Sequence, residues 1–478
     1  INVEKSLYYR VQVKNPEPEK GFWSKIAQNF EKEHMMIWWD GEFRWKGKGE
    51  FVELVEFATY EDFVKRFPKT KRDRINKAKE MVENGEISKV HFNFTGFVKQ
   101  EKGNIMGKDE FEPQKPRMIY GIDWFTKAIA GLWFLNYTKV VKALFSINSF
   151  IWYVSGATTD NFSLWYNQTS QLLGSSITYL VSDFSRFDIT QGIEIIKNNT
   201  RRYRQAGFMD LPWAKHILHA LEHTKLYCRG LIATYLGGIK SGSMDTSVAN
   251  TTTVAILFGS FFQRFKGYLE NVRIATLGDD NFTMINTEWL IKTFKTAELM
   301  KEQLSVWILR AGLIVKMRIT REIMEAEFLS MRFYPVKDGF AVGKKPGRTM
   351  VRCGHLMKRN HTEEEFKGLL KATLISYLPT SNHVPFLRKY VKIVLEHLKD
   401  VKEVKPDFEY EDKYILGNLS VANEETWVSF HEVYGLTQED EEKFGEKLEA
   451  CINKLGLACY LDCHSVDTLV QVEKDLDL

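Results

Sequence analysis

The sequence predicts an α+β fold with an antiparallel sheet. Short apolar strands and longer helical stretches follow one another in the order β, α, β, loop, α, β-turn-β, α, β, which is typical of that class. Glycine-centred turns separate several of the strand-like runs, and no internal repeat interrupts the pattern. With 478 residues, of which 44% are hydrophobic, the chain is long enough for two or three packed regions.

Residues 60–85 carry apolar side chains at helical spacing beneath a strongly basic face, which predicts a helix. The runs that follow are assigned from the same kind of spacing. The predictions are strand character at 89–102, mostly helix over 122–154, and a segment over 175–190 that begins as an apolar strand and ends in acidic residues. Two lysines and an asparagine interrupt the apolar run 128–154, so we interpret it as buried helix and not as a membrane span.

The second half of the chain opens with a predicted hairpin, a glycine-serine loop and a long apolar helix over 226–265. Residues 271–286 predict two short strands around a turn, and a helix follows them. A further strand is predicted at 325–335. The last 120 residues alternate helical and polar loop patterns.

Charge is informative locally and not in total. The net charge of +4 does not by itself indicate a nucleic-acid partner, but residues 65–80 and 343–352 are strongly basic. Such runs are ordinarily solvated faces. The five cysteines show no disulfide framework, which indicates reduced thiols. Cys459, Cys463 and His464 lack a second half at zinc-finger spacing, so they do not predict a zinc site.

The stretch "RIATLGDDNF" places Asp279 and Asp280 side by side between β-prone residues. The alternating apolar residues on either side predict a hairpin with the two carboxylates at its tip. An exposed turn is the ordinary alternative, because Gly, Asp and Asn are common turn formers. Adjacent carboxylates repel each other unless a cation compensates them.

A second pair of carboxylates lies upstream in "SDFSRFD". Asp183 stands at the end of a predicted strand and Asp188 follows five positions later. A carboxylate at a strand end can project toward one on a neighbouring hairpin, and two such groups can hold two Mg²⁺ ions roughly 4 Å apart. The hairpin aspartates are thereby compensated.

Between these pairs lies "SGSMDTSVANTTT" (241–253), a flexible loop that opens a helix. Thr246 and Asn250 are four residues apart and therefore share one helix face, from which polar groups could reach a ribose. Ordinary capping residues at a helix N-terminus are the alternative interpretation.

Together these motifs resemble motifs A, B and C of viral RNA-dependent RNA polymerases, in order, spacing and local structure. Motif A is matched by Asp183 and Asp188. Motif B is matched by Ser241-Gly242, Thr246, Asn250 and Thr251, and motif C by Gly278-Asp279-Asp280.

Other segments extend the resemblance over roughly residues 60–350. "FVKQEK" (97–102) and "KPRMIYG" (115–121) resemble the fingers segments around motif F. "AGLIVKM" (311–317) resembles motif D, and "EAEFLSMRFYP" (325–335) resembles motif E. The combination is most similar to positive-strand RNA viruses of the tombusvirus-like and nodavirus-like supergroup. Asn281 and Phe184 depart from many relatives, but neither side chain stands at a metal-binding position.

The resemblance implies a two-metal nucleotidyl transfer. Asp183 and Asp279 would bind two Mg²⁺ ions, with Mn²⁺ able to substitute, and Asp280 would assist them. The backbone carbonyl of Phe184 would complete one metal's shell. Lys316 is the candidate general acid for pyrophosphate, and a structural lysine on that segment is the alternative.

The resemblance also implies how nucleotide and RNA are held. Asp188, Asn250 and Thr246, with Ser241, would recognise the 2′-hydroxyl of the incoming nucleotide, while Gly242 would let the motif B loop shift. Two groups of basic residues would complete the site. They are Arg117 and Lys115 at the triphosphate, and Lys99 and Lys102 along the nucleotide or template channel.

A right-hand polymerase architecture follows from the same resemblance. The predicted fingers are 1–174 and 200–226, the palm is 175–199 and 227–340, and the thumb is 341–478. Implied partners are an RNA template, nascent RNA, NTPs and other viral replication proteins, with no DNA. The implied location is the host cytoplasm, at membrane-associated replication complexes reached through regions outside this chain, which begins with Ile1 and reads as a piece of a longer protein.

Two rival functions stay open on the sequence. A reverse transcriptase shares the paired aspartates but usually carries a bulky aromatic residue where Asp188 stands. A catalytically dead palm acting as an RNA-binding scaffold would be expected to lose acidic ligands, and all three are present. The sequence holds no G-x4-G-K-[ST] phosphate loop, so no helicase is predicted within it.

Overall fold

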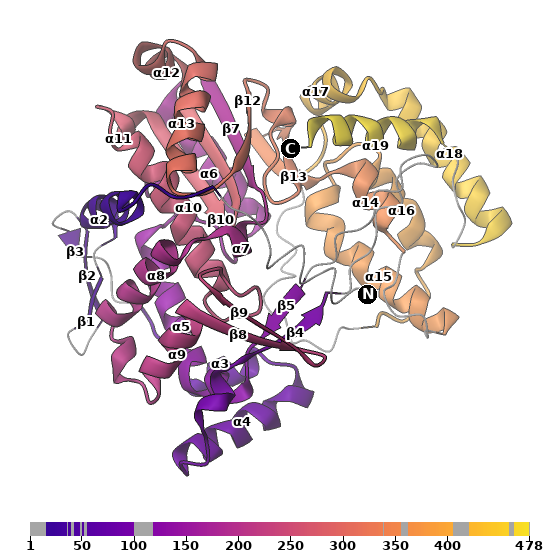
Figure 1. Ribbon diagram of the computed structural model, residues 1–478. Helices are drawn as coiled ribbons and strands as arrows, with labels where there is room; N and C mark the ends of the chain where they lie inside the picture. Colours follow the sequence, from indigo (N-terminus) through magenta and orange to yellow (C-terminus); the bar gives the residue numbers. More distant parts are fainter. Residues whose placement is uncertain are drawn as a thin grey trace. The chain divides into compact units, whose positions relative to one another are not determined.

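The computed structural model describes residues 16–99, 118–354, 362–404, 420–457 and 463–477, apart from 36, 40–42, 48–49, 52–54 and 338. Its helices and sheets confirm the α+β class (Figure 1). The chain divides into two compact units. Unit 1 is Ile1–Ser155, Ser182–Thr283 and Glu288–Met317; unit 2 is Gly156–Val181, Met284–Thr287 and Arg318–Leu478. The division into fingers, palm and thumb stays a prediction.

Unit 1 begins with helix α2 (Phe22–His34) and a small sheet of β1 (Ile37–Trp39), β2 (Phe43–Gly47) and β3 (Glu50–Phe51). The helix predicted over 60–85 is two helices, α3 (Tyr60–Lys65) and α4 (Lys69–Glu83). Pro68 separates them because its ring excludes an intrahelical N–H and disfavours helix for the preceding residue.

In the region 122–154, the prediction of helix is wrong for the last residues. Helix α5 ends at Leu144 (Trp124–Leu144), and β6 (Ile151–Tyr153) follows where helix was expected. Strand β6 pairs in parallel with β10 (Val272–Leu277), and all three of its side chains are buried. A short apolar run buried on both faces carries no periodicity, so spacing alone could not distinguish it from helix.

The central sheet has the strand order β12-β7-β11-β10-β6. Its remaining strands are β7 (Ile177–Phe184), β11 (Asp280–Asn286) and β12 (Val315–Thr320). The predicted hairpin over 271–286 is confirmed. The strand predicted at the start of 175–190 is confirmed as β7, whereas residues 187–190 at the end of that segment form a short helix. A two-residue connection at Gly278 and Asp279 joins β10 to β11, which requires them to run antiparallel.

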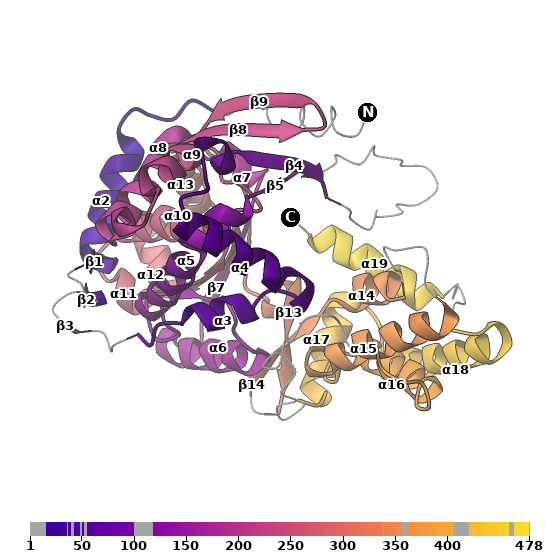
Figure 2. The same cartoon turned by 90° about the horizontal axis from the view of Figure 1, so that it is seen from below.

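A second sheet in unit 1 has the order β5-β4-β8-β9 (Figure 2). It consists of β4 (Phe94–Val98), β5 (Met118–Gly121) and the hairpin β8 (His223–Cys228) and β9 (Leu231–Leu236). The predicted strand at 89–102 is therefore shorter than expected, because the 3₁₀ turn η1 (Lys89–Phe92) precedes it. The predicted hairpin after residue 226 is confirmed, although it begins at His223.

The long apolar helix predicted after the glycine-serine loop is α10 (Thr246–Phe262), which is buried on all sides from Val248 onward. It packs against α2, β10 and α13. The other helices of this part of the chain are α7 (Phe187–Thr190), α8 (Ile193–Gln205), η2 (Phe208–Asp210), α9 (Ala214–Glu222), α11 (Tyr268–Asn271), α12 (Thr287–Phe294) and α13 (Ala297–Arg310).

Unit 2 contains α6 (Thr159–Leu173), η3 (Ile323–Glu325) and the pair β13 (Met331–Val336) and β14 (Gly339–Lys344). The strand predicted at 325–335 starts only at Met331, because Leu329 and Ser330 adopt positive φ angles that form a turn. Helices confirm the expectation for the C-terminal part. They are α14 (Pro346–Arg352), α15 (Glu363–Ser381), α16 (Leu387–His397), α17 (Glu424–Tyr434), α18 (Gln438–Leu455) and α19 (His464–Leu476).

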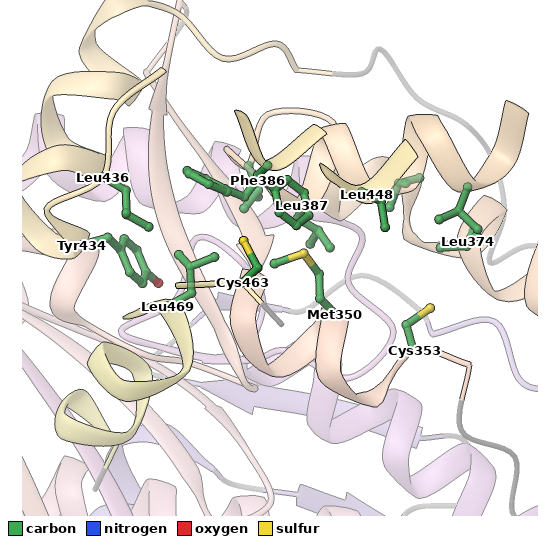
Figure 3. Close-up of a cluster of buried hydrophobic side chains, with 14 of the residues drawn as sticks. Met350, Cys353, Leu374, Phe386, Leu387, Tyr434, Leu436, Leu448, Cys463 and Leu469 are labelled. Atoms are coloured by element: carbon green, nitrogen blue, oxygen red, sulfur yellow. The ribbon is translucent and has the colours of Figure 1, made fainter. Parts of the chain in front are cut away.

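These C-terminal helices enclose their own apolar core (Figure 3). Met350 of α14, Leu387 of α16 and Leu469 of α19 are among its buried side chains. Cys463 belongs to the same cluster, while Cys459 lies outside the described residues. Among the helices that the structure describes, none is both long and apolar enough to cross a membrane.

Candidate active site

The first predicted carboxylate lies where β7 ends. Five consecutive residues of β7 are buried before Asp183, whose side chain is exposed, and Phe184 is buried again. A strand that is buried up to its last two residues therefore exposes one carboxylate to solvent near its end. The Phe184 ring packs against Phe187 with ring centroids 4.5 Å apart, which fixes the chain beyond the strand.

The second and third carboxylates lie at the tip of the β10–β11 hairpin. Gly278 has a φ of 68°, a left-handed value that glycine adopts without strain. Its N–H donates to the Thr251 hydroxyl of α10 at 2.8 Å, and the Thr276 hydroxyl donates to the Asp280 carbonyl at 3.1 Å. Contacts from a buried helix and from the strand itself thus hold the turn that carries Asp279.

The sheet order brings these carboxylates to neighbouring strands. Strand β7 lies beside β11, so Asp183, at the end of one, and Asp280, at the start of the other, belong to adjacent strands. Carboxylate oxygens are the ligands that Mg²⁺ prefers, so the donor set suits such an ion. Within the described ranges, no three Asp, Glu, His or Cys side chains are grouped closely enough to form a metal site.

Asp188 and Asn250, predicted to act together, are brought into contact. The Asn250 amide nitrogen donates to an Asp188 carboxylate oxygen at 2.7 Å, across 62 residues of sequence. The backbone of this segment is anchored as well, because Ile239 N–H donates to the Asp188 carbonyl at 2.6 Å. Asp188 is half-buried and Asn250 is only 5% exposed.

Gln191, which sequence reasoning missed, extends this contact. Its side-chain nitrogen donates to the side-chain oxygen of Asn250 at 2.6 Å, and its own side-chain oxygen lies 3.2 Å from the Thr253 hydroxyl. Both Gln191 and Thr253 are buried. No signal in the sequence identifies Gln191, because its partners lie about sixty residues away.

The loop before α10 is held to β5. The Ser241 hydroxyl donates to the Met118 carbonyl at 3.2 Å, and a side chain at Gly242 would overlap the carbonyl of Tyr120. The Thr246 hydroxyl lies 2.7 Å from the Lys240 carbonyl, to which it donates. Ser241 and Thr246 therefore have structural partners in or near the loop, and their predicted contacts with ribose stay predictions.

Lys240, also not identified from the sequence, is buried beneath this loop. Its ammonium donates to the backbone carbonyls of Leu221, Gly237 and Gly238, the last at 2.7 Å. Burial lowers the pKa of Lys240 to about 7, and Asp245 opposes that shift. A buried lysine with three carbonyl partners ties the start of the loop to the end of α9.

The structure describes only two of the predicted basic site residues. Lys316 is an exposed residue of β12, and Lys99 is exposed just after β4. Lys102, Lys115 and Arg117 lie outside the described residues. Their predicted roles at the triphosphate and in the channel stay predictions.

Comparison with known proteins identifies a matching family. A family model described as viral RNA-dependent RNA polymerase matches residues 59–377, about two thirds of the chain. The match includes every residue that the sequence analysis assigned to the site. No curated protein matches the chain.

Proposed function

The chain belongs to the viral RNA-dependent RNA polymerase family and is thus an RNA-directed RNA polymerase, and from that premise we propose how its residues act. The reaction is template-directed transfer of a nucleotidyl group from an NTP to an RNA 3′-hydroxyl, with pyrophosphate leaving. The observation that carries the proposal is that Asp183 ends β7 while Asp280 begins the neighbouring strand β11, with Asp279 in the turn just before it, all inside the matched region.

Asp183 and Asp279 would hold two divalent cations, with Asp280 and the Phe184 carbonyl assisting. Bound Mg²⁺ supplies activation of the attacking hydroxyl and neutralisation of charge on the triphosphate. The chain's own contribution is to fix the carboxylates before substrate arrives. The Thr251 hydroxyl does so for the hairpin tip through its hydrogen bond with Gly278.

Asp188 and Asn250 would bind the 2′-hydroxyl of the incoming nucleotide. The Asp188 carboxylate accepts from that hydroxyl, and the second amide hydrogen of Asn250 donates to its oxygen. A deoxynucleotide lacks the hydroxyl that would make both bonds, so the site disfavours it. The 2.7 Å contact between the two side chains supports this assignment.

The remaining roles rest on the resemblance of the motifs. Arg117 and Lys115 would neutralise the triphosphate, and Lys99 and Lys102 would line the channel. Lys316 would protonate the leaving pyrophosphate. We also propose the right-hand arrangement of fingers, palm and thumb, the tombusvirus-like and nodavirus-like affiliation, and action with other viral proteins at host membranes.

The test is extension of a labelled RNA primer on an RNA template with Mg²⁺ or Mn²⁺ and either NTPs or dNTPs. We expect extension with NTPs, and its loss in Asp279→Ala. The matched control is Asp210→Ala, which removes an exposed carboxylate of unit 1 outside the site and should leave extension unchanged.

Three contrary results are possible, and two of them favour a named rival. Equal use of dNTPs would favour a reverse transcriptase and refute the 2′-hydroxyl assignment. A folded, RNA-binding wild type that extends nothing with either metal would favour a dead palm. Extension that survives in Asp279→Ala would remove the hairpin tip from the reaction.

A further inference from the structure

The strongest unassigned feature is the buried polar relay behind Asp188. All of its hydrogen bonds join side chains. The Asn250 nitrogen donates to Asp188, and the Gln191 nitrogen donates to the Asn250 oxygen. The Gln191 oxygen lies against the Thr253 hydroxyl. Gln191 is 1% exposed and Thr253 is fully buried, so water does not compete for these bonds.

Charge fixes the direction of this relay. An ionised Asp188 only accepts hydrogen bonds, so Asn250 must turn its amide nitrogen toward it. The Asn250 side-chain oxygen then faces Gln191, so Gln191 must donate to it from its side-chain nitrogen. The Gln191 side-chain oxygen then faces the Thr253 hydroxyl at 3.2 Å, whose single proton also has the Ala249 carbonyl within 2.9 Å. Each amide therefore has one orientation in which every member is satisfied.

We propose that Gln191 is a positioning residue for sugar selection. It holds the Asn250 amide in the orientation that leaves one N–H directed at the incoming 2′-hydroxyl. The proposal rests on the proposed function, and it adds a residue that touches neither nucleotide nor metal. Without Gln191, the Asn250 side-chain oxygen loses its donor, and the amide is held by Asp188 alone and can move away from the 2′-hydroxyl.

Two variants test this role. Gln191→Met keeps the approximate volume and removes both hydrogen bonds. Gln191→Glu keeps the shape but can only accept, so it forces the Asn250 amide to turn over. The readout is the ratio of kcat/KM for an NTP to that for the matching dNTP. We expect this ratio to fall about ten- to hundredfold, the worth of one charge-assisted hydrogen bond.

A structural defect alone would lower both kcat/KM values together and leave their ratio unchanged. The matched control, Gln205→Glu, makes the same chemical change on the exposed side of α8 and should keep the wild-type ratio. An unchanged ratio in both Gln191 variants, with NTP extension intact, would overturn the proposal and leave the polymerase assignment standing. Wild type that extends nothing would instead overturn the proposed function.

A double variant that reverses the direction of these hydrogen bonds separates an effect on stability from an effect on sugar selection. In Gln191→Glu with Asp188→Asn, the carboxylate at 191 accepts from Asn250, and Asn250 accepts from the amide at 188. We expect the thermal midpoint lost in Gln191→Glu to return, while discrimination against dNTPs stays low. Recovery of discrimination together with the midpoint would contradict the assignment of Asp188 as the group that reads the sugar.

A separate observation concerns the face formed by α3, α4 and α5, which lie together in Figure 2. Residues 65–80 contain eight basic and two acidic residues. Helix α4 packs along α5 over the buried side chains of Phe63 and Ile75. This packing adds two lysines of α5, Lys127 and Lys142, to the basic face.

Several of these cations lie beside other cations. Burial and then the nearby Lys71 lower the pKa of Lys127. Burial and then Arg66 and Lys139 lower the pKa of Lys142. Arg74 and Lys77 are exposed on α4 and form no ion pair in the described chain. Like charges are thus gathered at two places along α5, and Asp123 offsets them only in part at Lys127.

The two places are 15 residues apart on α5, or roughly 22 Å along the helix. We infer that this face binds an RNA phosphate backbone, which supplies a row of negative charges over such a span. Sequence-independent binding of this kind is what a chain that copies RNA needs outside the reacting site. This inference concerns RNA affinity, so it is measured without NTPs or divalent ions.

The test compares two charge-matched double variants. Arg74→Gln/Lys77→Gln removes unpaired cations, whereas Lys65→Gln/Lys79→Gln removes cations of the same helices that are already paired with glutamates at 3.1 and 3.5 Å. Affinity for a fluorescent single-stranded RNA is measured against salt. Two lost phosphate contacts should reduce the slope of log Kd against log salt by about 1.4 in the first variant only.

Equal slopes in both variants would overturn the inference. So would a loss confined to anionic vesicles containing phosphatidylserine, with RNA slopes unchanged, since the face would then be a membrane surface. Asp279→Ala should keep the wild-type slope, which separates RNA binding at this face from failure of catalysis.

Discussion

Gly242→Ala is the most direct steric test of the loop that precedes α10. An added Cβ would overlap the Tyr120 carbonyl oxygen and lie 3.0 Å from its carbonyl carbon and 3.3 Å from Ile119 Cγ2. The obstacle is backbone of β5, which is paired with β4 and cannot swing aside. The loop must therefore move away from β5.

The required movement is about 1 Å, judged from ordinary contact distances between carbon and its neighbours. It strains the 3.2 Å hydrogen bond from the Ser241 hydroxyl to the Met118 carbonyl. Overpacking costs about 1–3 kcal/mol and the hydrogen bond about 1 kcal/mol, so we expect a loss of roughly 2–4 kcal/mol in unfolding free energy. A displacement of that size near a reacting centre costs about a hundredfold in kcat.

Denaturant unfolding and primer extension measure the two effects. The control is Gly192→Ala, which adds the same methyl group in unit 1 where nothing lies within 4 Å and φ is −65°. That variant should stay within about 1 kcal/mol of wild type, the scale of an N-cap change. If Gly242→Ala matches Gly192→Ala in both measurements, the loop is not constrained by β5 and the steric reasoning fails.

Three further results are expected. Thr251→Val leaves the Gly278 N–H without its partner, which should cost about 1–2 kcal/mol in unfolding free energy and lower kcat more than it changes KM for NTP; unchanged kcat would mean that other contacts hold the turn. Lys240 has its pKa lowered from 10.5 to about 7, so the folded state binds fewer protons than the unfolded state between these values. Stability relative to Lys240→Met should therefore rise by about 1.4 kcal/mol per pH unit through that window, and parallel pH profiles would contradict the burial argument. Chelation of divalent ions should abolish extension reversibly while RNA binding persists, and extension in excess chelator would refute the role of Asp183 and Asp279.

Much of the fold could be predicted because its signals are local. The β10–β11 hairpin follows from alternating apolar residues around Gly278, and the end of β7 at its acidic residue follows from an apolar run that stops. Strand β6 could not be predicted, because three buried residues carry no period and their partner β10 lies more than a hundred residues away.

The residues of the site could likewise be predicted from local patterns, but most of their contacts could not. The spacing of Asp183, Asp188 and Asp279, and their resemblance to known motifs, identified candidates without identifying their contacts. The contact of Asp188 with Asn250 was predicted as a shared role and is present as a hydrogen bond. The partners Gln191 and Lys240 were not predicted, since glutamine and lysine in a sequence carry no mark of burial.

The sequence by itself determined most of the elements, the order of the motifs and the chemistry of the carboxylates, because helical and strand periods and turn residues act over a few neighbouring positions. Tertiary structure alone decided that Thr251 holds the Gly278 turn, that Gln191 orders the amide of Asn250, and that Gly242 meets Tyr120. These contacts join residues 27, 59 and 122 positions apart. Their geometry depends on how buried faces pack, which no local pattern encodes.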